Sequence, residues 1–223
     1  GRGGGGLRTS TVPVTIYNDD RDTKVKINLF RKEDLAKFIV DAVGEHLESK
    51  NTAEDSKDTE KDSKVRTKHL EYDLDNPQDF DCLKTALEKE LANYAKSNSS
   101  YDFNRLDLLK EAILILAFYN SESYKKLKAG AFSTIESIQP FLTDKNRGKW
   151  DDLKKEGFNL VFRKNSNPAL NFNEMECLHV FIQDIVIPVK SKFMRESGTR
   201  VTDAPGIMAN SKDTERALKA ALN

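Results

Sequence analysis

The sequence predicts an α+β protein that is predominantly α-helical, with a small N-terminal β-hairpin plus helix unit joined to a larger helical body. Two patterns support this prediction. Near the N-terminus, apolar and polar residues alternate as in half-buried strands, and over most of the remaining chain apolar residues recur at helical spacing. A third observation is that segments too poor in apolar residues to form a core separate and flank these stretches.

These polar segments set the predicted domain boundaries. The two ends are expected to be flexible arms, because burial cannot offset the entropy lost on ordering them. The predicted parts are a Gly/Arg arm (1–11), a ββα unit (12–48), a charged flexible linker or insert (49–68), a helical body (69–194), and a C-terminal tail with a short amphipathic helix (195–223).

The N-terminal unit begins with two alternating runs, over residues 12–17 and 24–29, on either side of the polar segment 18–22. This arrangement predicts a β-hairpin with one apolar face. A lone hairpin is only marginally stable in water. We therefore expect it to pack on the amphipathic helix that the spacing predicts over residues 35–47.

The helical body is expected to open with a short strand over residues 70–74. Asn76, Pro77 and Asp79 then supply a helix cap, a first-turn proline and a first-turn acid, which together predict a helix start. The buried stripe of this helix is predicted to be Phe80, Leu83, Leu87, Leu91 and Tyr94.

A second long helix is expected to begin at Asn104 and to continue to Tyr119. It is apolar on nearly all sides, so we predict that it is the central buried helix. Other elements are predicted as helices over 121–128, 133–142 and 149–156 and as a brief strand over 158–162.

The last helix of the body is predicted from Asn171 to Ile187, where Pro188 would end it. The β-branched residues between Ile182 and Ile187 weaken this prediction, because they favour strands. The segment 211–222 has the pattern of a short amphipathic helix, which would be stable only when docked.

Composition narrows the classes of function. The chain has 36 basic and 36 acidic residues, and this balance argues against binding nucleic acid by bulk charge alone. The charge is unevenly distributed, because residues 125–200 hold fourteen Lys or Arg and nine Asp or Glu. Two widely separated cysteines favour a reducing, cytoplasmic location. The sequence also predicts neither a signal peptide nor a membrane span.

Candidate chemistry is sparse. The histidines His46, His69 and His179 are far apart, so zinc-binding spacing is absent. Cys177 and His179 are two positions apart, and on a helix such residues point to different faces. We therefore expect a non-enzymatic protein that needs no cofactor.

An acidic run suggests a metal site at first reading. It departs from a calcium-binding loop, because Pro77 takes a ligand position and Gln78 takes the position of the required glycine. Helix capping and solvated charge explain the run better. Its members are Asp73, Asp75, Asp79 and Asp81.

A basic region offers a candidate nucleic-acid interface, in which cations would contact phosphates and the interleaved Tyr124 and Trp150 would stack on bases. A similar arrangement of Lys190, Lys192 and Arg195 surrounds Phe193. The alternative is an ordinary solvated helix surface with the aromatic residues in the core. The candidate cations are Lys125, Lys126, Lys128, Arg147, Lys149, Lys154, Lys155, Arg163 and Lys164.

Self-association is the second functional expectation. A hairpin edge can accept a strand, and a tail helix can dock on another copy of the chain. The sequence thus favours a self-associating protein that coats or packages single-stranded RNA, in the manner of a nucleocapsid. The alternative is a protein–protein adaptor whose arms fold on a partner. The candidate assembly residues of the tail are Ala217, Leu218, Ala221 and Leu222.

Overall fold

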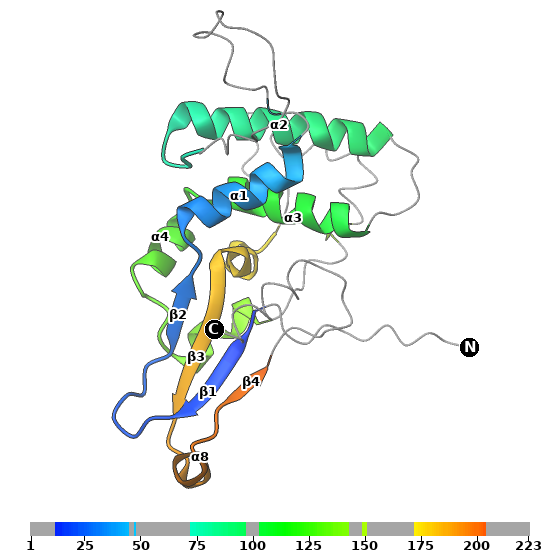
Figure 1. Cartoon of the computed structure of the whole chain (residues 1–223). Coiled ribbons are helices and arrows are strands. Elements are labelled where there is room, and N and C mark those ends of the chain that lie inside the picture. Colours follow the sequence, from blue (N-terminus) through cyan, green and yellow to red (C-terminus); the bar gives the residue numbers. More distant parts are fainter. Residues whose placement is uncertain are drawn as a thin grey trace, which may run out of the picture.

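The computed structural model has a mixed α+β architecture, so the predicted fold class is confirmed. A four-stranded sheet extends from a group of longer helices, α1, α2 and α3, which lie together at one end of the molecule (Figure 1). The structure describes residues 12–44, 47, 72–96, 103–142, 149–150 and 172–203.

The N-terminal part contains β1 (Val14–Asn18), β2 (Lys26–Leu29) and α1 (Lys32–Val43). The predicted helix is therefore confirmed from Leu35 to Val43, whereas Leu47, at its predicted end, is not helical. Leu35 and Ile39 are fully buried on the apolar stripe of α1. This stripe packs against α3, which comes from the helical body, and also contacts α2.

The predicted hairpin between the first two strands is wrong. The strand order is β2-β3-β1-β4, so β3 (Ile182–Val189) lies between β1 and β2. It runs parallel to β1, with Val14 opposite Ile185, and antiparallel to β2, with Ile27 opposite the same residue. Alternation shows which face of a strand is apolar, but not which strand lies beside it. The connection over residues 19–25 therefore crosses β3. It spans about 10 Å from β1 to β2, which is twice the spacing of neighbouring strands.

The two faces of the sheet differ in polarity. Directly opposed residues share a face, and the row through Ile185 is apolar across β2, β3 and β1, where it joins Ile27, Ile185 and Val14. On the other face, the Thr15 and Thr202 hydroxyl oxygens lie 3.1 Å apart, and Asn28 Nδ2 donates to Asp184 Oδ1 at 2.7 Å. Residue Thr202 belongs to β4 (Val201–Asp203), which pairs antiparallel with β1 and is exposed along its length.

The helix predicted from the Asn76-Pro77 signal is confirmed as α2 (Pro77–Lys96). Asn76 Oδ1 accepts the backbone N–H of Gln78 at 2.9 Å, as a cap should. The strand predicted just before it is wrong over its described residues. Tyr72 and Leu74 are buried, but neither is in a strand, and Leu74 lies in a turn where Asp73 Oδ1 accepts the N–H of Asp75. Aspartate side chains compete in this way with regular backbone pairing.

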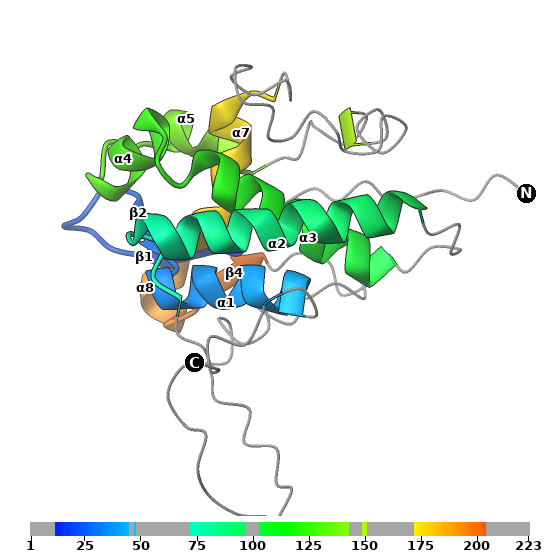
Figure 2. The same ribbon diagram turned by 90° about the horizontal axis from the view of Figure 1, so that it is seen from above.

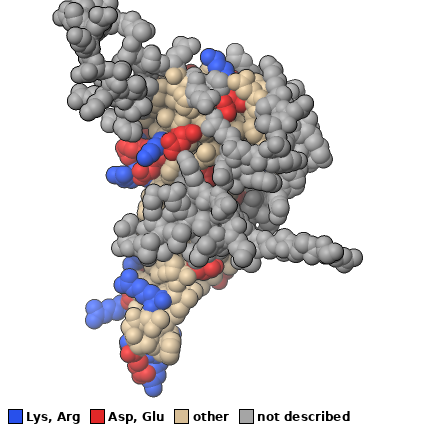
Figure 3. Space-filling model, turned by 45° about the vertical axis from the view of Figure 1, so that its right-hand side comes forward, with Lys and Arg blue, Asp and Glu red and all other residues tan. Residues whose placement is uncertain are grey.

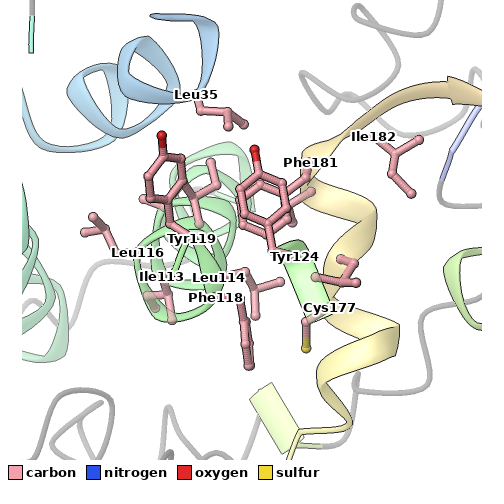
Figure 4. Close-up of a cluster of buried hydrophobic side chains, with 14 of the residues drawn as sticks. Leu35, Ile113, Leu114, Leu116, Phe118, Tyr119, Tyr124, Cys177, Phe181 and Ile182 are labelled. Atoms are coloured by element: carbon pink, nitrogen blue, oxygen red, sulfur yellow. The ribbon is translucent and has the colours of Figure 1, made fainter. Parts of the chain in front are cut away.

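The core centres on α3 (Phe103–Phe118), as predicted for the most apolar helix. Viewed from above, α2 and α3 run across the middle, with α1 on one side and α4, α5 and α7 on the other (Figure 2). Side chains from α1, α3, α4 and β3 meet around Tyr124 and Phe181, whose rings stack with centroids 4.0 Å apart (Figure 4). The N- and C-terminal halves of the chain therefore share one core.

Shorter helices follow α3 where the sequence predicts them. They are α4 (Glu122–Lys128), α5 (Ile135–Ile138) and the 3₁₀ turn η2 (Gln139–Phe141). Thr134 and Ser137 form a reciprocal capping box at the start of α5. Only Lys149 and Trp150 of the predicted helix over 149–156 are described, and both are helical. The predicted strand over 158–162 lies outside the described residues.

The long helix predicted over 171–187 is wrong beyond its first turns. The chain forms α7 (Glu174–Cys177) and the 3₁₀ turn η3 (Leu178–Phe181), and then continues as β3. The β-branched run that weakened the prediction is the reason, since such residues pack well on a sheet. Pro188 is tolerated because β2 pairs with β3 only as far as Val186, so the proline has one neighbouring strand.

The structure adds two elements to the C-terminal part of the chain that the sequence did not predict. These are α8 (Lys192–Ser197) and β4. Ser191 caps α8, and Gly198 ends it in the left-handed conformation at φ +64°. The predicted N-terminal arm, charged linker and tail helix lie outside the described residues.

Candidate nucleic-acid interface

The first candidate surface is α4, which holds three of the predicted cations. Ser121 Oγ accepts the N–H of Tyr124 and fixes the start of the helix. Lys125 Nζ lies 2.6 Å from Glu122 Oε1, and this contact lowers the pKa of the Glu122 carboxyl. Lys126 is exposed and makes no ion pair within the described part of the chain. All three lysines of α4 are exposed on the outside of the core.

Lys128 has a different environment. Its ammonium lies 4.7 Å from the ring centroid of Tyr124 and 5.7 Å from that of Tyr119, in cation–π geometry. Tyr124 is only 4% exposed, because its ring stacks on Phe181. In Figure 4 the hydroxyl groups of both tyrosines point toward the side where α1 lies. Tyr124 is therefore a core residue, and its predicted role as a base-stacking platform is wrong.

Trp150 is buried in the same way. Its ring lies 4.8 Å from that of Phe172, and Lys110 of α3 lies over it. Lys149 is placed above the ring of Phe172 at 5.6 Å. Lys149 thus contacts a different aromatic residue from Lys128, which lies over Tyr119 and Tyr124. The candidates that lie outside the described residues are Arg147, Lys154, Lys155, Arg163, Lys164, Ala217, Leu218, Ala221 and Leu222.

A second surface lies at the far end of the sheet, where α8 meets the β1–β2 connection. We call residues 19–26 and 190–200 the tip surface. Ser191 N–H donates to Asn18 Oδ1 at 2.8 Å, and Ser191 Oγ accepts the N–H of Met194. These bonds fix α8 to the end of β1. In Figure 3 this end of the molecule shows blue and red side chains around a tan surface.

The carboxylates of the tip surface are already engaged. Arg195 Nη1 lies 3.2 Å from Asp20 Oδ2, and Lys192 Nζ lies 3.9 Å from Glu196 Oε1. Residues 190–200 contain four cations and one acid, a net charge of +3. The tip cations that make no ion pair within the described residues are Arg21, Lys24, Lys190 and Arg200.

Two other carboxylates of the tip surface serve the loop itself. Asp19 Oδ1 accepts the N–H groups of Arg21 and Asp22, and these bonds lower the pKa of Asp19. Asp22 accepts the N–H of Lys24 and pairs with Lys26 at 2.9 Å, and both contacts lower its pKa. These acids shape the turn and remain ionised near neutral pH.

Phe193 is the most exposed large apolar side chain described, at 72%. It lies on α8, next to Lys192 in sequence and within three residues of Lys190 and Arg195, all of which are exposed. The sequence places cations around Phe193 as it does around Tyr124 and Trp150. Burial distinguishes the two regions, because Tyr124 and Trp150 are buried and Phe193 is not.

The acidic run before α2 forms a structural network. The Tyr119 hydroxyl donates to Asp75 Oδ1 at 2.8 Å, while Lys32 Nζ lies 3.2 Å from Asp75 and 3.1 Å from Asp73. Burial and this hydrogen bond raise the pKa of Tyr119, and the N–H of Asp75 together with Lys32 lowers that of Asp73. Asp79 accepts the Asp73 N–H. These three acids thus hold the turn before α2 together, and Asp79 is buried rather than solvated as the sequence predicted.

The cysteine and histidine that lie two positions apart in the sequence, Cys177 and His179, both have contacts within the fold. Cys177 is fully buried, and His179 Nδ1 lies 2.8 Å from the carbonyl oxygen of Glu176. Within the described residues, no group of three or more His, Cys, Asp and Glu side chains is arranged to hold a metal ion. His46 and His69 fall outside them.

Nothing matches this chain in comparisons with protein-family models, curated proteins and solved structures. Among the helices that the structure describes, none combines the length and apolar character needed to cross a bilayer.

Proposed function

We propose that this chain is a non-enzymatic, self-associating protein that coats or packages single-stranded RNA in the cytoplasm. The observation that carries the proposal is the presentation of Lys125 and Lys126 on the exposed side of α4, whose only acid is Glu122. Cations held on a capped helix can contact successive phosphates without first ordering a loop.

Salt dependence of RNA binding tests this role. Each phosphate contact in a single-stranded complex contributes about 0.7 to the slope of log affinity against log salt concentration. The double variant Lys125→Gln and Lys126→Gln should bind labelled oligo(U) more weakly and lower the slope by about 1.4. Lys37→Gln, on the exposed side of α1, is the control and should leave the slope unchanged.

Absence of RNA binding by the wild-type chain at low salt would refute the proposal. An unchanged slope in the double variant would place the phosphate contacts elsewhere on the molecule. Light scattering together with the 260/280 absorbance ratio adds a check on assembly. A coat-type protein should purify as an oligomer that carries nucleic acid.

A protein–protein adaptor is the second candidate function. The observation that favours it is the exposure of β4, whose Val201 is 48% exposed. The three residues of β4 pair with β1, and among the described strands none lies on the other side of β4. A sheet edge of this kind can accept a strand from another protein. A clean monomer without nucleic acid would favour the adaptor.

A further inference from the structure

Phe193 is held at the surface by a well-defined local structure. Its helix is short, but Ser191 caps the start and Gly198 closes the end. The helix is tied to β1 through Asn18 and to the β1–β2 connection through Asp20. The exposed ring therefore sits on an anchored element of the fold. Leaving such a ring in water forgoes about 2 kcal/mol of burial free energy, so a contact partner would stabilise it.

The charges around the ring indicate the chemistry of that partner. Residues 190–200 carry a net charge of +3, and Lys190 and Arg200 form no ion pair within the described part of the chain. The nearby acids Asp20 and Glu196 are neutralised by Arg195 and Lys192. The other two acids of the tip surface, Asp19 and Asp22, accept backbone N–H groups of the β1–β2 connection, and Asp22 also pairs with Lys26. A polyanion would thus meet Lys190 and Arg200, which are unpaired within the described residues, on the two sides of Phe193 in sequence.

The size of the apolar surface distinguishes between classes of partner. A protein interface of ordinary stability needs a contiguous patch of several hundred Å² per side. Around Phe193 the helix presents Lys192, Arg195, Glu196 and Ser197, all exposed and polar. A single exposed ring with cations near it in sequence is too small to form such a patch. It matches the arrangement by which proteins bind single-stranded nucleic acid, in which a base stacks on an aromatic ring and cations contact the phosphate backbone.

We propose that Phe193 is a base-stacking site for single-stranded RNA, with Lys190 and Arg200 contacting phosphates of the same strand. This inference rests on the proposed function and adds a second site to it. The tip surface lies beyond the sheet, whereas α4 packs beside the helical core (Figure 1). One RNA strand that runs between the two sites would cross the length of the sheet.

The test compares Phe193→Leu with Phe193→Trp in the full chain. Leucine keeps the apolar volume but removes the ring, and tryptophan keeps a stacking face. Anisotropy with labelled oligo(U) of about 12 nucleotides should show affinity about 5- to 100-fold weaker for Phe193→Leu and close to wild type for Phe193→Trp. The salt slope of Phe193→Leu should be unchanged, because its phosphate contacts remain.

Two controls separate stacking from charge and from general surface effects. An abasic oligonucleotide of equal length has phosphates but no bases, so the wild type and Phe193→Leu should bind it equally. Ile135→Ala removes another exposed apolar side chain, which is 50% exposed at the start of α5, and should leave oligo(U) affinity unchanged.

Each outcome has a distinct meaning. If Phe193→Leu binds oligo(U) like the wild type while the α4 double variant is weakened, the stacking site is wrong and the proposed function stands. If the wild type binds no RNA at low salt, both are wrong. If Phe193→Leu instead lowers the oligomer mass in light scattering with RNA affinity intact, the ring docks on a second copy of the chain, and the inference is overturned.

Discussion

At the scale of single residues, Tyr119 links three parts of the chain. Its hydroxyl reaches Asp75 before α2, and Asp75 in turn pairs with Lys32 at the start of α1. Its ring packs against Phe80 and Tyr124. One side chain at the end of α3 thus joins the apolar core to a polar network that holds the beginnings of α1 and α2 in place.

We expect Tyr119→Phe to lower the free energy of unfolding by about 1–2 kcal/mol, because the hydrogen bond to a carboxylate is lost while the ring contacts remain. Urea unfolding followed by circular dichroism measures the change. Tyr17→Phe is the matched control, since its hydroxyl reaches Asp19 only at 3.4 Å. Equal stability of Tyr119→Phe and the wild type would show that the network adds nothing to folding.

At the scale of elements, helix ends depend on backbone conformation as well as on side-chain caps. Gly198 ends α8 at φ +64°, in the left-handed region, whereas Gly44 ends α1 at φ −51°. A Cβ atom at either position would meet no heavy atom within 4 Å. The two glycines therefore differ in backbone strain alone.

Alanine at these positions should have opposite effects. Gly198→Ala should lower the free energy of unfolding by about 1 kcal/mol, because L-residues disfavour positive φ. Gly44→Ala should raise it by about 0.5 kcal/mol, since the unfolded chain loses freedom and the folded chain gains no strain. Thermal and urea unfolding of both variants provide the comparison. Destabilisation of equal size in the two variants would contradict this explanation.

At the scale of the whole molecule, β3 unites segments that are far apart in sequence. It comes from residues 182–189, yet it fills the gap between β1 and β2 near the N-terminus. The α1 helix likewise packs on α3 rather than on the strands that precede it. The segment that the sequence predicts as a separate ββα unit therefore takes its partners from the remainder of the chain.

A fragment of residues 1–68 should consequently lack a cooperative unfolding transition. Its strands β1 and β2 do not pair with each other, and a sheet of unconnected strands is not stable in water. Adding the fragment 69–223 should restore the transition, because β3 and α3 would supply the missing surfaces. Calorimetry of each fragment and of the mixture measures this. A cooperative transition in the first fragment alone would be the contrary result.

Prediction of the candidate site from sequence succeeded only in part. The sequence identified the cations of α4 and those around Phe193, because charge and spacing are visible in it. It could not show that Tyr124 and Trp150 are buried while Phe193 is exposed. Aromatic residues occur at similar spacing in cores and in binding surfaces, and only the packing of distant segments separates the two.

The sequence by itself determined the fold class, the approximate positions of α1 to α4 and the Asn76 cap of α2, because these depend on local spacing and on groups within one turn of the chain. Tertiary structure alone decided that β3 is a strand and not the end of a helix, and that it separates the strands of the expected hairpin. The reason is physical. A run such as Ile185 to Ile187 is apolar on both sides and suits a buried helix or a central strand, so the choice depends on the surfaces that β1 and β2 present to it.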